Sequence, residues 1–562
     1  MEEEQEKENE ERKESEQEER TRKKTIAEHG EDEKRVDEKM KNEHEELKED
    51  EEEKEGLIGR VKEYMKKKIE EEEEEGRYRL LLLPILFILK GSPVTADPPN
   101  VIIMLMDDMG WGDLGWNGEP SRETPNIDRL AAEGLTVPHM YTAAPLCSPS
   151  RASLLTGRLP IRNGFYSDNT HGMNAYTPQE IVGGIPDEEV LLPEALAARN
   201  YTSGLIGKWH LGHRDQYLPL KHGFHSWFGA PNCHFGPYSG ITTPNIPVFR
   251  DDHMLGRYYK DFAIDKNKGV SNMTELFIQE AVEFIERESS KGPFFLFWTP
   301  DSIHAPTYSS PHVRGTSRRG RYGDAVKETD AGVGAIVEAL RTQGVDNNTL
   351  IFFSSDNGAA LVSKEDGGSN GPFLCGKQTT FEGGMRAPGI FWWPGVIPAG
   401  SVSYQVMTHM DLFSTVAQIA GAEIPSDRII DGLPLYNSLV HPELEILRPV
   451  FLYRGDRLMA VRKGSYKMHL WTFSTPTDEL ARGINFCPGE EIPNLTTPIP
   501  TNHTGQPILF NIEVDPGEKY PLSRFTQEYS KQVTELQQVV SDHEAQLVPG
   551  EPMLNWCDNA VM

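Results

Sequence analysis

Four short apolar runs occur between residues 100 and 355 of the chain. Residues 100–106 (NVIIMLM) and 349–355 (TLIFFSS) are nearly continuous in their apolar character, as is the run at 294–298, and residues 203–207 form a weaker one. Runs of this length and continuity are typical of strands that are buried on both faces of a parallel sheet. We therefore predict four buried parallel strands.

Amphipathic segments with helical spacing lie among these runs, at 124–133, 191–199, 274–287 and 322–340. Strands that alternate with helices along a chain indicate a parallel sheet with helices packed on both faces. We therefore expect an α/β fold, in which a ligand would lie beyond the carboxyl ends of the strands.

The pattern changes near residue 449. Residues 452–455 and 459–464 have the alternation and turn residues of short strands, and residues 526–546 form one amphipathic helical stretch. We expect a larger catalytic domain at 97–447 and a smaller C-terminal domain at 448–562, the latter built from an antiparallel sheet and a helix.

The first 76 residues are low in complexity and contain 33 acidic and 18 basic residues, a charge of −15 out of −30 for the whole chain. They lack sustained apolar heptads, so we predict solvated helix or disorder rather than a coiled coil. The remaining residues have the composition of an ordinary acidic globular protein, with no basic patch to indicate nucleic-acid binding.

Residues 77–96 have the pattern of a secretory signal peptide, in which Arg77 and Arg79 precede an apolar stretch at 80–89 and a small-residue end. The apolar stretch is too short to span a bilayer. Because such a signal normally opens a chain, we expect the residues before it to come from a misplaced start codon or an inserted exon. A signal anchor with an acidic cytosolic tail is the alternative. The mature protein would begin near Asp97.

Polar side chains follow each of the four predicted strands. They are Asp107 and Asp108, Lys208 and His210, Asp301 and His304, and Asp356 and Asn357. Because the carboxyl ends of parallel strands meet at one edge of a sheet, we expect these side chains to form one site. The oxygen ligands at 107, 108, 356 and 357 suit Ca²⁺ or Mg²⁺ rather than zinc.

Plainer interpretations exist for these residues when each is taken alone. An Asp pair after a strand is often a helix cap or an Asx turn. Lys208 and His210 are two residues apart, so on extended backbone their side chains would point the same way, and such a pair is often only surface. His304 alone would be a structural histidine.

A cysteine opens the segment CSPSRASLLTGR at residues 147–158. Pro149 suits a first helical turn, and Arg151 would lie one turn beyond Cys147, near any anionic charge there. An isolated cysteine would be a buried thiol or half of a disulfide. This segment, however, resembles the signature of the sulfatases, in which the cysteine is oxidised in the endoplasmic reticulum to formylglycine.

The chemistry of sulfate esters explains why an aldehyde is useful at this position. The oxygens of a sulfate ester carry negative charge and repel nucleophiles, and a thiolate that attacked sulfur would leave an adduct that is hard to clear. A hydrated aldehyde carries two hydroxyls on one carbon, of which one can attack sulfur while the other later collapses to the carbonyl and expels sulfate. This is covalent catalysis with its own release step.

The resemblance to the sulfatases extends from about residue 98 to the end of the chain. The blocks at 106–115 and 207–213 are family-wide, whereas four others resemble the lysosomal members that remove 6-sulfate esters from galactosamine and galactose: 145–166, 174–187, 231–238 and 367–386. The resemblance implies an alkaline-phosphatase-like fold, with a sheet sandwiched by helices. It also implies a lysosomal enzyme that acts on keratan sulfate and chondroitin 6-sulfate, which are sulfated glycosaminoglycans.

Metal and nucleophile roles are implied by the matching positions. Ca²⁺ would be bound by Asp107, Asp108, Asp356 and Asn357, with formylglycine 147 as a further ligand. Asp356 would also draw the proton from the attacking hydroxyl, and Arg151 would stabilise the hydrated aldehyde.

Substrate roles are implied in the same way. Lys208 and Lys377 would hold sulfate oxygens, and His210 would take the proton that lets the second hydroxyl collapse. His304, together with Lys377, would face the leaving sugar oxygen as an acid or hydrogen-bond donor. Tyr176 would line the sugar side.

The cysteines other than Cys147 are also assigned by the resemblance. Cys375 and Cys487 would be bridged, which would pin the loop that carries Lys377 to the C-terminal domain. Cys233 would be a free thiol. Cys557 departs from the family, because its partner there lies further downstream, so it would be unpaired or the chain truncated.

Maturation in the secretory pathway is the further expectation. The chain has five Asn-x-Ser/Thr sites that fit a secreted or lysosomal glycoprotein, at Asn200, Asn272, Asn347, Asn494 and Asn502. The resemblance implies a formylglycine-generating enzyme as a maturation partner, and a homodimer without a membrane span.

Four other interpretations remain open from the sequence. The enzyme could have another sulfatase specificity, such as a 4-sulfatase or an arylsulfatase. A phosphatase or phosphonate hydrolase of the same superfamily is disfavoured, because the cysteine motif specifically invites formylglycine. A catalytically inactive binding protein for sulfated glycans is disfavoured by the complete set of polar residues. An interaction scaffold would rest on residues 1–76 only.

Overall fold

The computed structural model describes residues 98–169, 181–234, 245–472, 487 and 501–555. The expectations for the acidic segment, the signal peptide, Tyr176, Asn494 and Cys557 lie outside the described residues. The division into domains at residue 448 stays a prediction.

A ten-stranded mixed sheet forms the centre of the larger region. Five neighbouring strands at its middle are parallel: β9 (Thr349–Ser355), β1 (Asn100–Met106), β8 (Phe294–Thr299), β4 (Thr202–Lys208) and β5 (Ser226–Ala230). In the register of β1, Val101 lies opposite Phe295 of β8 and Leu350 of β9. The four predicted strands are confirmed, those at 100–106 and 349–355 with the same bounds.

Shorter strands extend the sheet on both sides. On the β9 side these are β10 (Ile390–Trp392), β2 (Leu135–Thr136) and β11 (Ser401–Val402), and on the β5 side β6 (Pro247–Arg250) and β7 (His253–Arg257). β10 runs antiparallel to β9, and β6 runs antiparallel to β5, so the sheet is mixed rather than wholly parallel.

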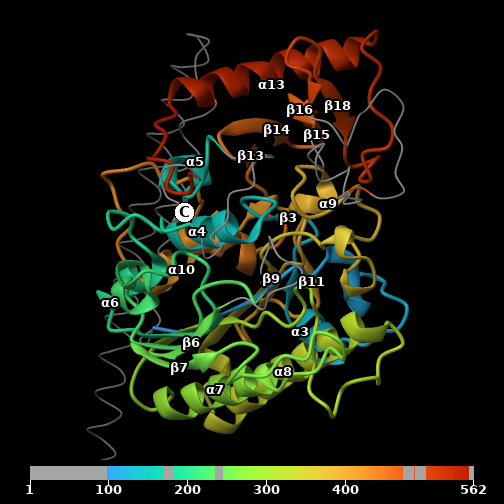
Figure 1. Cartoon of the computed structure of the whole chain (residues 1–562). Helices are drawn as coiled ribbons and strands as arrows, with labels where there is room; N and C mark the ends of the chain where they lie inside the picture. The colour runs from blue at the N-terminus through green and yellow to red at the C-terminus, as the bar shows by residue number, and fades with distance from the viewer. Residues whose placement is uncertain (1–97, 170–180, 235–244, 473–486, 488–500, 556–562) are drawn as a thin grey trace, which may run out of the picture. The chain divides into compact units, whose positions relative to one another are not determined.

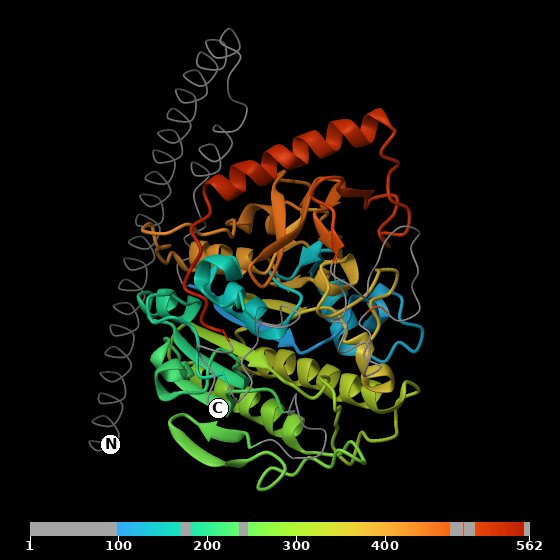
Figure 2. The ribbon, with the colours of Figure 1, turned by 45° about the horizontal axis from the view of Figure 1, so that its top comes forward.

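Helices cover both faces of this sheet, as the alternating pattern predicted (Figure 1). One face packs against α3 (Pro125–Glu133), α7 (Met273–Glu288) and α8 (Gly320–Gln343). The other face packs against α4 (Cys147–Thr156), α6 (Leu192–Ala197) and α10 (Met410–Ala420). Alternate residues of β1 supply the two cores: Ile102 and Met104 belong to the first, Val101 and Ile103 to the second. Figure 2 shows the same layers from a second direction.

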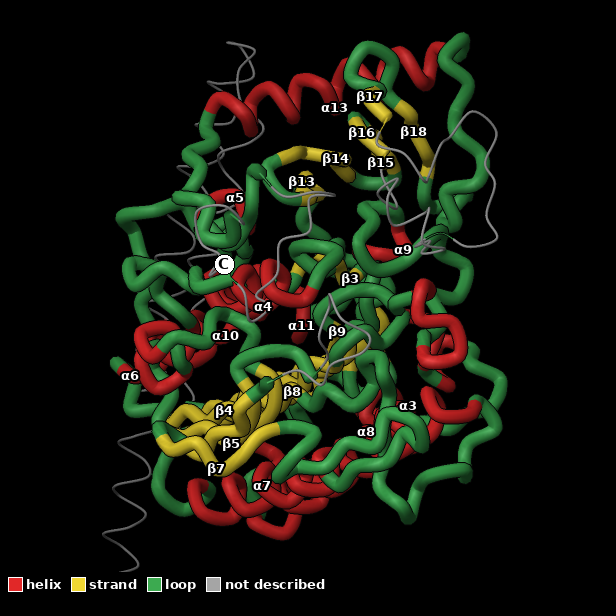
Figure 3. Tube along the Cα trace, in the orientation of Figure 1, coloured by secondary structure: helices red, strands yellow, loops and turns green. Residues whose placement is uncertain are grey.

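A second, smaller sheet lies in the C-terminal region, as predicted (Figure 3). It is antiparallel and contains β13 (Pro449–Arg454), β14 (Arg457–Lys463), β15 (Tyr466–His469) and β18 (Ile508–Asn511). The helix α13 (Gln527–Ala545) lies along one face, where Val533, Leu536 and Val540 pack in the same apolar cluster as Val461 and Met468 of the sheet.

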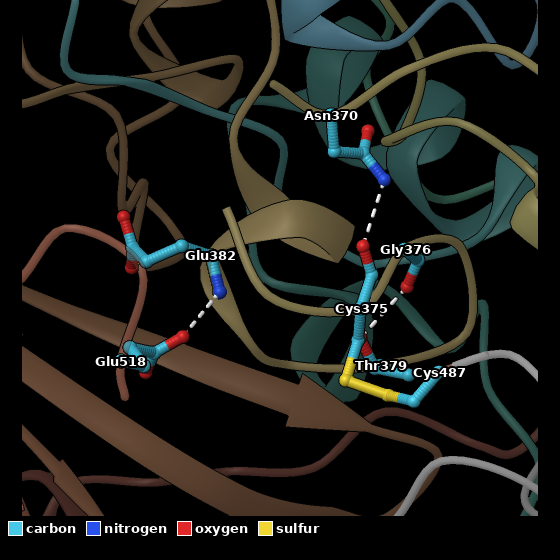
Figure 4. The surroundings of a disulfide bond; sticks show 7 residues. All are labelled: Asn370, Cys375, Gly376, Thr379, Glu382, Cys487 and Glu518. Atoms are coloured by element: carbon cyan, nitrogen blue, oxygen red, sulfur yellow. Dashed lines mark hydrogen bonds between the residues drawn. A yellow bond between two sulfur atoms is a disulfide. The ribbon is translucent and has the colours of Figure 1, made fainter. Parts of the chain in front are cut away.

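The opposite face of the small sheet meets the larger region through buried charges. Arg462 of β14 pairs in register with Lys467 of β15, so their side chains share this face. The inter-sheet cluster consists of these two cations and three residues from loops and a short helix: Glu382, Arg386 and Glu518. A disulfide between Cys375 and Cys487 links the same two regions, as the resemblance to the family implied (Figure 4).

Within the described residues, no helix is both long and apolar enough to cross a membrane.

Candidate active site

The carboxyl ends of the central parallel strands bring the predicted polar residues together. Asp107 and Asp108 directly follow β1, Asp356 and Asn357 directly follow β9, and Lys208 is the last residue of β4. Their side chains are fully or almost fully buried. This confirms that one edge of the sheet gathers residues that are distant in sequence, as parallel strands require.

The helix α4 brings Cys147 to this edge. Cys147 is the first residue of the helix, Pro149 lies in its first turn, and Gly157 ends it in a left-handed conformation with φ of 69°. The Sγ of Cys147 lies 3.5 Å from Asp107 Oδ1 and 4.0 Å from Asp108 Oδ1. The helix therefore presents position 147, with the partial positive charge of its N-terminus, to two carboxylates.

Arg151 fixes the carboxylate after β9. Its side chain is wholly buried, and its Nε and Nη2 donate to Asp356 Oδ2 at 2.9 and 2.7 Å. Its Nη1 donates to the backbone carbonyl of Lys208 at 2.9 Å. One guanidinium thus ties α4 to the ends of β9 and β4, and its two charge-assisted hydrogen bonds to one carboxylate oxygen fix the position of Asp356.

Two lysines lie on either side of the aspartate pair. Lys208 Nζ donates to Asp107 Oδ2 at 2.8 Å, and Lys377 Nζ donates to Asp108 Oδ2 at the same distance. Lys377 Nζ also lies 3.0 Å from His304 Nε2. The strand-end cluster, as we use the term, comprises these residues: Asp107, Asp108, Cys147, Arg151, Lys208, His304, Asp356, Asn357 and Lys377.

The surroundings of the carboxylates in this cluster shift their pKa values in opposite directions. Burial opposes ionisation of Asp107, but Lys208, His304 and Arg151 outweigh it and hold the pKa of Asp107 well below its usual range. Burial and the neighbouring Asp107 raise the pKa of Asp356 to about 6, despite Arg151. Burial also raises the pKa of the Cys147 thiol well above its ordinary value, so a thiolate is disfavoured here.

The two histidines are held neutral. Burial and the nearby Lys377 lower the pKa of His304 to about 4, and burial, Lys208 and Arg151 lower the pKa of His210 well below its ordinary value. A neutral imidazole can accept a proton, which is the capacity that the resemblance to the family implied for His210. The expectation of extended backbone there is wrong, because His210 has φ of 68° and its amide donates to the carbonyl of Pro231.

The cluster has the donors of a metal site. Ligand atoms of Asp107, Asp108, Cys147 and His304 lie within 4.8 Å of one another. Asn357 Nδ2 donates to Asp108 Oδ1 at 2.7 Å, while its own Oδ1 is buried and has no hydrogen-bond partner among the described residues. Such an oxygen beside buried carboxylates is what a hard divalent cation would bind.

The loop that carries Lys377 is held from several sides. The amide of Lys377 donates to Ala359 O at 3.0 Å, and the amide of Gln378 donates to Pro145 O at 2.7 Å. The carbonyl of Cys375 accepts a bond of 2.8 Å from Asn370, close to the disulfide (Figure 4). The position of the Lys377 ammonium therefore depends on contacts both to the approach to α4 and to the C-terminal region.

Sequence reasoning underestimated the contribution of β5. Cys233, which follows this strand and is a free thiol as expected, places its Sγ 3.2 Å from Lys208 Nζ. His234 Nδ1 lies 2.9 Å from Asp301 Oδ2, and Tyr308 donates to Asp301 Oδ1 at 2.6 Å, which steadies the loop of His304. The available signal was a fifth short run, SWFGA, which was not recognised as a strand.

Comparison with known proteins agrees with this geometry. Residues 99–422 match the sulfatase family model, and residues 447–562 match the C-terminal region of aryl-sulfatase. The chain is 56% identical over 473 residues to N-acetylgalactosamine-6-sulfatase of Homo sapiens, covering 84% of this chain and 90% of that protein. It is 35% identical over 449 residues to arylsulfatase A of Bos taurus, covering 76% and 84%.

A solved structure extends the similarity to the fold. A sulfatase from Pseudoalteromonas sp. superposes with a TM-score of 0.67 at 28% identity, covering 81% of this chain and 93% of that one. Its α/β architecture is therefore shared by this chain. The chain belongs to the sulfatase family and is a hydrolase similar to the N-acetylgalactosamine-6-sulfatases.

Proposed function

We propose that this sulfatase hydrolyses 6-sulfate esters of N-acetylgalactosamine and galactose in chondroitin sulfate and keratan sulfate, with formylglycine at position 147 and Ca²⁺ beside it. The observation that carries the proposal is the position of Cys147, which opens α4 and faces Asp107 and Asp108, with Lys208 and Lys377 on either side of the pair. The 56% identity to N-acetylgalactosamine-6-sulfatase supports the specificity.

The nucleophile side of the site is served by α4 and β9. Hydrated formylglycine supplies one hydroxyl to attack sulfur and a second whose collapse releases sulfate. Arg151 stabilises negative charge at position 147 and orients Asp356, which it holds through two hydrogen bonds. Asp356 accepts the proton of the attacking hydroxyl, and His210 accepts the proton of the second.

The sulfate side is served by the two lysines. Lys208 and Lys377 bind different aspartates of the pair, so their ammonium groups can hold different sulfate oxygens as charge shifts in the transition state. His304 lies within hydrogen-bond distance of Lys377, and together they face the leaving sugar oxygen. We keep Tyr176 as a residue that lines the sugar.

Calcium is the cation that we propose, bound by Asp107, Asp108, Asp356, Asn357 and position 147. When bound, it supplies positive charge that neutralises sulfate oxygens. The partnerless Oδ1 of Asn357 supports this, since oxygen ligands from two strand ends suit Ca²⁺ better than a soft metal.

We also propose that the protein is a lysosomal glycoprotein that passes through the secretory pathway, and the exposure of its glycosylation sites supports this. The four described acceptor asparagines are exposed: Asn200, Asn272, Asn347 and Asn502. Glycans require such exposure. We also propose a homodimer and a formylglycine-generating enzyme as maturation partner, both on the similarity to the family.

Two measurements test the function. Peptide mass spectrometry around residue 147 should find the cysteine replaced by an aldehyde. Release of inorganic sulfate should be measured from 6-sulfated and 4-sulfated galactosamine oligosaccharides, and we expect the 6-sulfated substrate to be strongly preferred. Preference for the 4-sulfate would establish another specificity, and a confirmed aldehyde without turnover of either substrate would favour a binding protein.

A further inference from the structure

A cavity of about 800 Å³ lies between the C-terminal sheet and loops of the larger region. Its lining includes Arg462 of β14 and residues from loops of the larger region, among them Trp111, Phe373, Tyr404 and Ile446. None of its lining residues belongs to the strand-end cluster. Its volume falls in the range of sites that bind small molecules.

Arg462 is a buried cation whose direct partners are all neutral. Its side chain is among the largest that are fully buried, and its Nε donates to Gly464 O at 3.0 Å. Its Nη1 donates to the hydroxyl of Tyr141 at 2.6 Å, and its Nη2 lies 3.2 Å from His139 Nδ1. Within the part of the chain that the structure describes, no carboxylate lies within ion-pair distance of Arg462. A buried guanidinium without an anion is costly, and an anionic ligand would remove that cost.

The neighbouring groups do not balance this charge. In the inter-sheet cluster, Glu382 binds both Arg386 and Lys467, and Glu518 binds Lys467. Three cations, including Arg462, therefore face two carboxylates, which leaves one positive charge in excess. Burial, with Arg386 and Arg462 nearby, lowers the pKa of His139 to about 3, so this histidine is neutral at the pH of cells.

The remaining charged groups around the cavity do not change the balance. Arg448 also lines it but forms its own ion pair with Asp411. Glu445 and Glu513 are exposed at the rim, where water screens their charges. Of the three arginines that line the cavity, Arg386 and Arg448 each form an ion pair, so the one without an ion-pair partner among the described residues is Arg462.

Aromatic side chains form the walls next to this charge. The rings of Trp111 and Phe373 pack edge to face with centroids 5.0 Å apart, and the guanidinium of Arg386 lies 4.8 Å from the ring of Phe373. Tyr404 is 59% exposed and its ring is 6.0 Å from that of His139. Sugar rings have apolar C–H faces and polar edges, so flat aromatic walls around one charged group suit an acidic sugar.

We propose that this cavity is a second glycan-binding site, which holds an acidic sugar of the substrate chain with its carboxylate or sulfate oxygens against Arg462. That the bound sugar belongs to the substrate glycan rests on the proposed function, whereas the preference for an anionic sugar rests on the residues of the cavity. Trp111 lies three residues after Asp108, and Phe373 four residues before Lys377. A chain bound here is thereby held beside the two segments that form the catalytic centre, so long substrates gain affinity that a monosaccharide does not.

The test compares substrates of different length. We would measure kcat and KM for a fluorogenic 6-sulfated monosaccharide and for a 6-sulfated octasaccharide, using Tyr404→Ala and Arg462→Gln. The expected result is a rise of about tenfold in KM for the octasaccharide, with the monosaccharide constants unchanged. Matched controls are Tyr520→Ala, an exposed tyrosine outside the cavity, and Arg457→Gln, from the same strand as Arg462.

Direct binding distinguishes the two sources of the anion. Calorimetric titration with chemically desulfated chondroitin offers only carboxylates, and titration with keratan sulfate offers only sulfates. If Arg462→Gln lowers the affinity for desulfated chondroitin about tenfold, Arg462 binds a carboxylate. If it lowers the affinity for keratan sulfate by that factor, Arg462 binds a sulfate. Because Arg462 is buried, thermal unfolding must first show that its variant is folded; the exposed Tyr404 provides an independent variant.

Two outcomes would overturn the proposal. In one, Tyr404→Ala and folded Arg462→Gln bind and hydrolyse long chains like the wild type. In the other, they change monosaccharide and octasaccharide constants equally, which would assign the effect to the catalytic centre. Failure of the proposed function is distinct, since it would appear as no sulfate release from either substrate by the wild-type protein, while the binding titrations would still report on the cavity.

Discussion

The strand-end cluster and the inter-sheet cluster are both buried groups of acids and bases, yet their hydrogen bonding differs. In the inter-sheet cluster, Glu382 accepts bonds from Tyr141, Arg386 and Lys467, and Glu518 accepts from the amide of Glu382 and contacts Lys467. In the strand-end cluster, Asn357 Oδ1 has no partner among the described residues, and the donors converge as in a metal site. The buried carboxylates of both clusters are paired within the protein, but at the strand ends the amide oxygen of Asn357 is left for a ligand.

The largest effect should come from Cys147→Ala. The substitution removes the proposed source of the nucleophile and, because the side chain shrinks without creating a charge, it should leave the fold intact. We expect sulfate release to fall by about 10⁴-fold or more, with near wild-type thermal unfolding. Retained turnover would refute the assignment of position 147.

Asp356→Ala tests whether the strand-end cluster binds a metal ion that the inter-sheet cluster does not bind. Loss of this carboxylate removes a proposed ligand and the partner of Arg151, so bound calcium and activity should be lost together, the latter by about 10³-fold. Elemental analysis of the purified protein gives the metal content. The matched control is Lys467→Met in the inter-sheet cluster, which should keep its calcium. Unchanged metal in Asp356→Ala would count against the oxygen site.

Lys467→Met should affect stability instead of chemistry. Lys467 is fully buried between Glu382 and Glu518, so its removal takes from Glu518 the one lysine or arginine that pairs with it among the described residues. We expect a loss of about 3 kcal/mol in the free energy of unfolding, measured with urea, and a near-normal kcat for the folded fraction. The control is Lys463→Met, whose exposed pair with Glu535 should contribute less than about 1 kcal/mol. A large fall in kcat would mean that the two clusters are not separate in function.

A smaller effect should appear in the pH dependence of stability. The pKa of His139 is about 3 in the folded protein, against 6.5 when it is exposed, so the unfolded chain takes up a proton first. The stability that neutral His139 contributes is complete above pH 6.5 and declines as pH falls toward 3, by about 1 kcal/mol per pH unit. His139→Gln should therefore lose less stability between pH 6.5 and 4. Parallel curves for the two proteins would contradict this.

The apolar runs predicted part of the strand-end cluster because their signals are local, whereas the places of Cys147, Arg151 and Lys377 in it were implied by the resemblance to the family. Long apolar runs end directly at Asp107 and Asp356, so the strands and the residues after them could be identified together. The strand β5 was missed because SWFGA is short and only partly apolar. For the same reason, the contact between Cys233 and Lys208 was not predicted.

The inter-sheet cluster could not be predicted, because its pairs form only in the folded chain. Lys467 contacts Glu382, which lies 85 residues earlier, and no periodicity relates the two. The resemblance to the family did predict the nearby disulfide between Cys375 and Cys487. The left-handed backbone at His210 was not predicted either, because the residues around Lys208 give no signal of how the strand ends there.

The burial of Cys147 sets an order of events during biosynthesis. In the folded protein this residue is 3% exposed, so its side chain is out of reach of a second protein. If the thiol is oxidised by another enzyme, that enzyme must act on the nascent chain before α4 docks. Oxidation of the thiol must then be complete before the chain folds. A variant that folds faster than normal would be stable but would be secreted as an inactive enzyme.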